Sequence, residues 1–238
     1  MTIILKADKG SLLTPVEADN NIKELRDGTG AVTPALSGLT GTKIGDYATA
    51  EYGWHDLIGN IHVDEDDANA PKMALYRGLR VKARQFLPTT TEGLVDFHMP
   101  HDYVLGTPIH IHVHWSHTGV FVTGGSVTWG FELMYSKGHN QGAFAAPINI
   151  AIISPANVVQ YQQMTDETIA SSVGGNATTL DTNLLEPDGV IQGAVYLDSN
   201  DLTVSGGGIP DPFVHFVDIH YQSTGAATLN RLPNFYGA

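Results

Sequence analysis

The chain has 238 residues, with 12 lysines and arginines against 25 aspartates and glutamates, and its formal net charge is −13. This charge repels the phosphates of nucleic acids and the headgroups of anionic lipids, so we expect neither nucleic acid nor membrane as a partner. The absence of cysteine excludes disulfides and thiolate metal sites. No stretch approaches the roughly 20 apolar residues that span a bilayer, and the N-terminus lacks a signal-peptide pattern, so a soluble, unprocessed protein is expected.

The first 50 residues are predicted to form an N-terminal arm with one short helix at residues 14–27. Thr14 can cap this helix, a proline follows it at the first helical position, Glu17 completes a capping box, and Gly28 ends the helix. The helix has too few apolar positions to fold alone, so it must dock on its own body or on another chain. The rest of the arm is rich in glycine, threonine and alanine and nearly free of charge, which is typical of an extended segment.

Residues 51–238 are predicted to form one domain made of strands and turns. Only 16% of all residues are charged and 26 are glycine, which suits a surface of strands and turns. The predicted strands are residues 58–63, 79–86, 93–99, 109–117, 126–135, 148–153, 190–197 and 212–221. Because no long helical pattern separates these eight runs, we predict an all-β fold, an antiparallel β-sandwich of the jelly-roll type.

One predicted strand, PIHIHVHW, carries His110, His112 and His114 at alternate positions. Side chains alternate between the two faces of a strand, so these histidines share one face, while the isoleucines, valine and tryptophan between them face the core. Histidines two residues apart lie about 6.6 Å from one another along the strand, too far for all three to ligate one ion easily. A complete metal site therefore needs ligands from other strands.

Two other predicted strands carry the pattern Asp-x-His. They contain Asp96 with His98 and Asp218 with His220, and in each pair the two side chains share a face. If these strands flank the histidine strand, a polar patch of histidine and aspartate covers one sheet face. The candidate metal ligands are therefore His110, His112 and His114, with Asp96, His98, Asp218 and His220 as additional candidates.

Three interpretations of the histidine strand stay open. It can be a metal-free polar face at a surface or subunit contact, it can bind a structural transition metal on an oligomer axis, or it can bind a catalytic metal as in the cupins. Gly106, His112 and His114 match the beginning of the first cupin motif, but Thr118 and Gly119 stand where that motif has a glutamate. Nucleophile-elbow, Walker and dinucleotide motifs are absent, so we expect no catalytic residues and no bound cofactor.

Two parts of the sequence resemble proteins of tailed bacteriophages. The segment ILKADKGSLLTPVEADNNIKEL, residues 4–25, resembles a segment near the start of phage appendage and virion proteins. The stretches GWHDLIGNI, VDFHMPHDYVLGTPIHIHVHWSHTG and VTWGFELMYSKG are similar to a family of phage structural proteins in which an H-x-H-V-H-W strand precedes a W-x-F/L-E strand. The resemblance implies a virion component and does not decide between capsid decoration and tail attachment.

From this resemblance we expect a homotrimeric capsid decoration, or cement, protein that binds the major capsid protein or other virion proteins. It would be assembled in the cytoplasm of the bacterial host and then belong to the virion. A fibre or adaptor component of the head or tail is the alternative within the virion. The alternative from another class is a cupin-like metal-dependent enzyme that uses His112 and His114.

Overall fold

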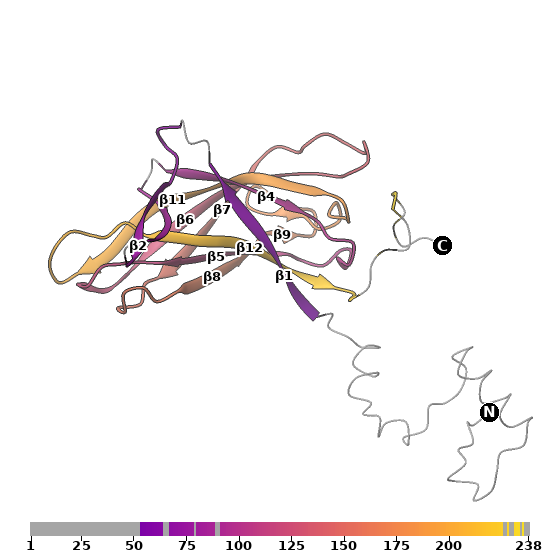
Figure 1. The fold of residues 1–238 in the computed structure, drawn as a ribbon. Helices are drawn as coiled ribbons and strands as arrows, with labels where there is room; N and C mark the ends of the chain where they lie inside the picture. The colour runs from indigo at the N-terminus through magenta and orange to yellow at the C-terminus, as the bar shows by residue number, and fades with distance from the viewer. Residues whose placement is uncertain are drawn as a thin grey trace, which may run out of the picture. The chain divides into compact units, whose positions relative to one another are not determined.

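Figure 1 shows the computed structural model of the chain. It describes residues 53–63, 67–78, 80–88, 91–225, 228, 231–233 and 235. The predicted arm of residues 1–50 and its helix at residues 14–27 lie outside the described residues. Within the described part of the chain, no helix has the length and apolar character needed to cross a membrane.

The described residues form strands joined by turns and loops. The strands are β1 (Gly53–His62), β2 (Lys72–Arg77), β3 (Val81–Gln85), β4 (Glu92–His98), β5 (His110–Ser116), β6 (Val122–Ser136), β7 (Ile148–Pro155), β8 (Met164–Ile169), β9 (Ser171–Ser172), β10 (Leu180–Asp181), β11 (Val190–Val204) and β12 (Phe213–Ser223). Except for the short parallel pair of β9 and β10, every strand pairing is antiparallel.

Eight of the strands build a two-sheet sandwich. One sheet has the order β1-β12-β5-β8, and the other has the order β4-β11-β6-β7. Numbered from 1 to 8 along the chain, these strands give the orders 1-8-3-6 and 2-7-4-5, the arrangement of a jelly roll built from two Greek keys. The predicted fold class is therefore confirmed.

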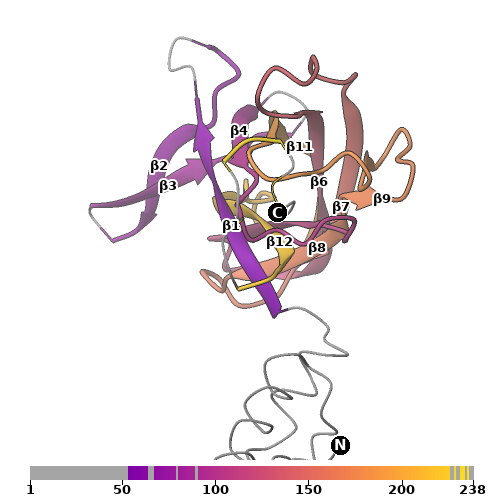
Figure 2. The same cartoon turned by 90° about the vertical axis from the view of Figure 1, so that its right-hand side faces the viewer.

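Strand β1 belongs to both sheets. Its residues from Gly53 to Gly59 pair with β12, and its last residues, from Asn60 to His62, pair with β4. At the crossing point, a Cβ added to Gly59 would lie 2.4 Å from the ring of Phe97, so only glycine fits there. The β2–β3 hairpin extends the first sheet beyond β12 and projects from the side of the sandwich (Figure 2).

The core lies between the two sheets. Ile111, Val113 and Trp115 of β5 are fully buried in it, which confirms the predicted core face of the histidine strand. The ring of Trp115 lies 6.1 Å from that of Trp129, and its indole nitrogen donates a hydrogen bond to the hydroxyl of Ser154. Burial of these aromatic side chains stabilises the sandwich, and the hydrogen bond to Ser154 gives the buried indole nitrogen of Trp115 a partner in the core.

Four of the observed strands were not predicted from the sequence: β2, β8 and the two-residue strands β9 and β10. In β8, MTDETI, only the first and last residues are apolar, because β8 is an edge strand that pairs with β5 alone and exposes much of its length. Such a strand lacks the apolar alternation that reveals a half-buried strand. Strands β6 and β11 also extend well beyond the predicted residues 126–135 and 190–197.

Candidate functional site

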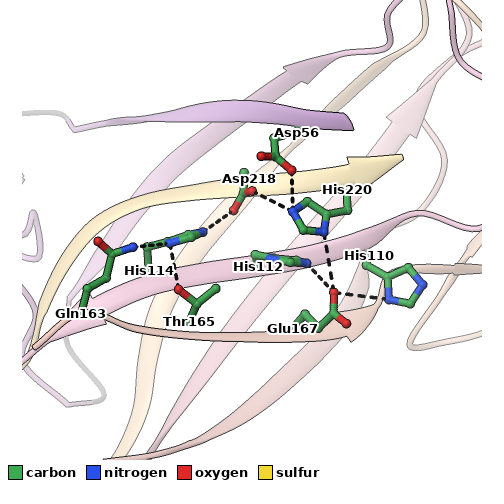
Figure 3. Close-up of polar contacts among 9 residues, drawn as sticks. All are labelled: Asp56, His110, His112, His114, Gln163, Thr165, Glu167, Asp218 and His220. Carbon is green, nitrogen blue, oxygen red and sulfur yellow. Dashed lines mark hydrogen bonds and ion pairs between the residues drawn. The ribbon is translucent and has the colours of Figure 1, made fainter. Parts of the chain in front are cut away.

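The outer surface of the β1-β12-β5-β8 sheet carries a cluster of imidazoles and carboxylates that we call the histidine face (Figure 3). It consists of Asp56, His110, His112, His114, Glu167, Asp218 and His220. The pairing of the strands arranges most of these residues in two adjacent rows. One row runs Glu167, His112, Asp218, and the other runs His110, His220, Asp56.

His112 is the most enclosed histidine of this face, with a side chain only 7% exposed. Its Nε2 forms a hydrogen bond with Oε2 of Glu167, and its ring lies 3.6 Å from the ring of His220. Burial and then the neighbouring His220 lower the pKa of His112, and these effects outweigh Asp218 and Glu167, which raise it. The imidazole of His112 is therefore held in its neutral form, the form that ligates metals.

His114 and Asp218 form a second buried unit. Nδ1 of His114 accepts hydrogen bonds from Nε2 of Gln163 at 2.7 Å and from the hydroxyl of Thr165 at 3.0 Å. The proton of this imidazole therefore lies on Nε2, which donates to Oδ1 of Asp218 at 2.9 Å. The Asp218 side chain is 3% exposed, and its other oxygen, Oδ2, lies 3.6 Å from Nε2 of His220.

His220 and Glu167 link the remaining groups of the face. Nε2 of His220 contacts Oδ1 of Asp56 at 2.5 Å. Oε2 of Glu167 lies 3.8 Å from Nδ1 of His110 and 3.9 Å from Nδ1 of His220, in addition to its bond with His112. One carboxylate oxygen therefore faces three imidazoles. Ligand atoms of His112, Asp218 and His220 lie within 4.8 Å of one another.

The structure brings together some of the metal ligands that were predicted from the sequence and separates others. His110, His112, His114, Asp218 and His220 all lie on the histidine face (Figure 3). The other Asp-x-His pair is on β4, in the opposite sheet, so it contributes nothing to this face. There Oδ1 of Asp96 lies 2.9 Å from His62, and Nε2 of His98 lies 3.3 Å from Asp188.

Sequence reasoning missed two members of the face, Asp56 and Glu167. Glu167 lies on β8, whose polar sequence gave no strand signal. Asp56 precedes the predicted start of the first strand, at residue 58, and lies opposite His220 only because β1 begins at Gly53. A search for alternating polar residues next to the histidine strand would have found neither, because both strands lie far away in the sequence.

A second set of histidines surrounds one carboxylate at the end of β4, and we call it the Asp188 cluster. Oδ1 of Asp188 contacts Nε2 of His101 at 2.8 Å and Nε2 of His98 at 3.3 Å, while Oδ2 contacts Nε2 of His139 at 2.7 Å. Burial alone would raise the pKa of Asp188, but hydrogen bonds from His139 and His101 and the charges of His101 and His98 lower it. This carboxylate therefore stays ionised.

The outer face of the other sheet carries a groove of about 600 Å³. Its lining includes Glu92, Leu94, Asp96, Glu132 and Met134, with three carboxylates and no lysine or arginine. Glu132, the first carboxylate after the histidine strand in the sequence, therefore lies on the opposite sheet from the histidines. The acidic lining makes this groove unsuitable for an anionic ligand.

No family model matches the sequence, and no curated protein matches it. Among solved structures, the chain is similar to a xylan-binding module CBM15, with a TM-score of 0.31 and 10% sequence identity over 72% of this chain and 92% of that chain. At this score the likeness carries no information on what this chain binds. The jelly-roll assignment follows from the pairing of the chain's own strands.

Proposed function

We propose that this chain is a structural protein of a tailed-bacteriophage virion, a trimeric capsid decoration protein that binds the major capsid protein and stabilises the head. The resemblance of residues 4–25 and of the histidine strand to phage structural proteins supports the virion assignment. On this proposal the chain acts by binding other virion proteins and not by catalysis.

The observation that carries the proposal is an apolar surface at one end of the sandwich. Three adjoining loops meet there, because Tyr161 donates a backbone hydrogen bond to His117 and Ser205 donates one to Phe121. Five large apolar side chains on these loops are more than half exposed: Val120 at 65%, Phe121 at 53%, Val158 at 57%, Val159 at 54% and Ile209 at 51%. Such a gathering of exposed apolar side chains is typical of a surface that binds another protein.

The opposite end of the sandwich is where the described body begins. Gly53 pairs with Ser223 at the end of β12, whereas the apolar loops adjoin the start of β12. The low-charge composition of residues 29–50 supports a role for that segment in contacts between chains.

The cupin-like alternative requires His112 and His114 to ligate one ion together. His114 has both ring nitrogens in hydrogen bonds, to Gln163 and Thr165 on one side and to Asp218 on the other. It would have to give up these bonds to become a ligand. This arrangement favours the structural role over the enzymatic one.

Capsid binding tests the proposal directly. We expect the full-length chain to be a trimer by size-exclusion light scattering and to co-sediment with capsids built from the major capsid protein of its phage. The double variant Phe121→Asp, Val159→Asp should fold normally, because both side chains are more than half exposed, and should lose capsid binding. Val173→Asp, at a side chain 80% exposed on another loop, is the matched control and should bind as the wild type does.

Two results would overturn the decoration role. One is a monomer that binds no capsid, and the other is co-sedimentation with purified tails in place of capsids, which would assign the chain to the tail. Retained capsid binding in the double variant would show that the apolar loops are not the contact surface and would remove the observation on which the proposal rests.

A further inference from the structure

We propose that the histidine face binds one divalent transition-metal ion, such as Zn²⁺, within a single chain, through His112, Asp218 and His220 (Figure 3). This site goes beyond the virion role, because it needs no partner molecule. It also differs from an ion on an oligomer axis, because all three donors come from β5 and β12 of one chain.

The first argument is the convergence of the donors. Ligand atoms of the three side chains lie within 4.8 Å of one another. An ion with bonds of about 2.1 Å spans donors up to about 4.2 Å apart, so small rotations of the side chains would complete the coordination. Two imidazole nitrogens and one carboxylate oxygen form a donor set that suits Zn²⁺ and neighbouring transition metals.

The second argument is the fixed orientation of Asp218. Its Oδ1 accepts the Nε2–H of His114 at 2.9 Å, and Gln163 and Thr165 in turn hold the other nitrogen of that imidazole. Oδ2 is left on the side of His220, at 3.6 Å from its Nε2. Ligating carboxylates are commonly oriented by such hydrogen bonds. His114 is therefore a positioning residue of this site and not a ligand.

The third argument is the local charge. Asp56, Glu167 and Asp218 lie together on the face. Among the described residues, all ion pairs of these three carboxylates are with histidines. A bound divalent cation would offset the negative charge of these carboxylates, of which Asp218 is 3% exposed while Asp56 and Glu167 are more than half exposed. Glu167, whose Oε2 already contacts His112, is placed to become a fourth ligand.

The site can be tested by titration of the full-length protein, stripped with a chelator, with ZnCl₂ in a calorimeter. We expect one ion per chain and a rise in the melting temperature. His220→Gln removes a ligand whose side chain is 30% exposed and should weaken binding about tenfold or more. His139→Gln, in the Asp188 cluster and 27% exposed, is the matched control and should bind Zn²⁺ as the wild type does.

The positioning role of His114 has its own expectation. His114→Gln should weaken Zn²⁺ binding by about tenfold while the stoichiometry stays at one ion per chain, because the three ligands remain. An unchanged affinity would remove His114 from the site. Asp218→Asn keeps the shape of the side chain but loses its charge, and it should weaken binding more than His114→Gln does.

Other outcomes would overturn the proposal. They are the absence of saturable Zn²⁺ binding by the wild type, equal affinity in wild type and His220→Gln, or one ion per three chains, which would indicate an ion on an oligomer axis. If His220→Gln does not fold, the visible absorption of wild-type protein loaded with Co²⁺ tests the site instead. One equivalent of Zn²⁺ per chain should remove the visible absorption of the bound Co²⁺, and a lack of such absorption would refute the site.

Discussion

The histidine face and the Asp188 cluster are made of the same two kinds of side chain but are built differently. In the Asp188 cluster, three imidazoles direct Nε2 at one carboxylate, and His98 among them is 62% exposed. On the histidine face, carboxylates and imidazoles from four strands lie in two adjacent rows, and His112 is only 7% exposed. Among the described residues, donors of three side chains converge within 4.8 Å only on the histidine face.

The difference follows from the elements that carry the two clusters. Paired strands fix the spacing of opposite residues at about 5 Å, so β5, β12 and β8 hold His112, Asp218 and Glu167 in one row. Asp188 lies outside the strands, in a turn where its φ angle is 60°, and its partners reach it from separate segments. Histidines near a carboxylate are therefore not sufficient for a metal site, because the donors must also converge.

The largest expected difference is between the two central carboxylates. Asp218→Ala removes a carboxylate whose side chain is 3% exposed and leaves the Nε2–H of His114 without its acceptor. The free energy of unfolding should therefore fall by about 3 kcal/mol. Asp188 is 19% exposed and its imidazoles can turn to water, so Asp188→Asn, which keeps a residue that tolerates the φ of 60°, should cost about 1 kcal/mol. Urea unfolding of the metal-free proteins measures both losses, and equal losses would contradict the comparison.

The histidine face and the Asp188 cluster should affect the stability of the protein in different pH ranges. His215, on β12 beside the histidine face, has its pKa lowered from 6.5 by burial and then by His114. Acidification below pH 6.5 therefore protonates the unfolded chain before the folded one, and stability should decrease from that pH downward. The pKa of Asp188 is lowered from 3.8, so its contribution is present above pH 3.8 and is lost only as the pH falls further, through the folded pKa.

Unfolding free energies measured from pH 8 to the lowest pH at which the chain stays soluble would resolve these two ranges. His215→Gln should reduce the loss that begins near pH 6.5, and Asp188→Asn should reduce only the loss below pH 3.8. If His215→Gln left the upper range unchanged, the folded protein would not hold this histidine neutral.

The smallest expected effect lies at the rim of the Asp188 cluster. His98 is 62% exposed and 3.3 Å from Asp188, so His98→Ala should change the free energy of unfolding by about 0.5 kcal/mol or less. The corresponding change on the histidine face, His114→Ala, removes a donor to a buried carboxylate and should cost about 2 kcal/mol. Thermal unfolding of the two variants makes this comparison, and a larger loss for His98→Ala would reverse it.

Much of the fold could be predicted from the sequence, because it depends on apolar alternation. The pattern of Ile111, Val113 and Trp115 identifies a strand and its core face, and the structure buries all three completely. The polar strand β8 could not be predicted in this way, because an edge strand whose outer residues face water needs no apolar period. The long strands β6 and β11 were found but not their ends, since strand ends depend on how far the partner extends.

The sequence by itself determined that His110, His112 and His114 share one face of a strand and that this face is turned away from the core, because side-chain alternation is a local property of the backbone. Only the tertiary structure decided which carboxylates meet them. Asp218 with His220 lies beside the histidine strand, and Asp96 with His98 does not, although both pairs show the same pattern. The physical reason is that strand order follows from packing two apolar sheet faces against each other, which no single strand's sequence specifies.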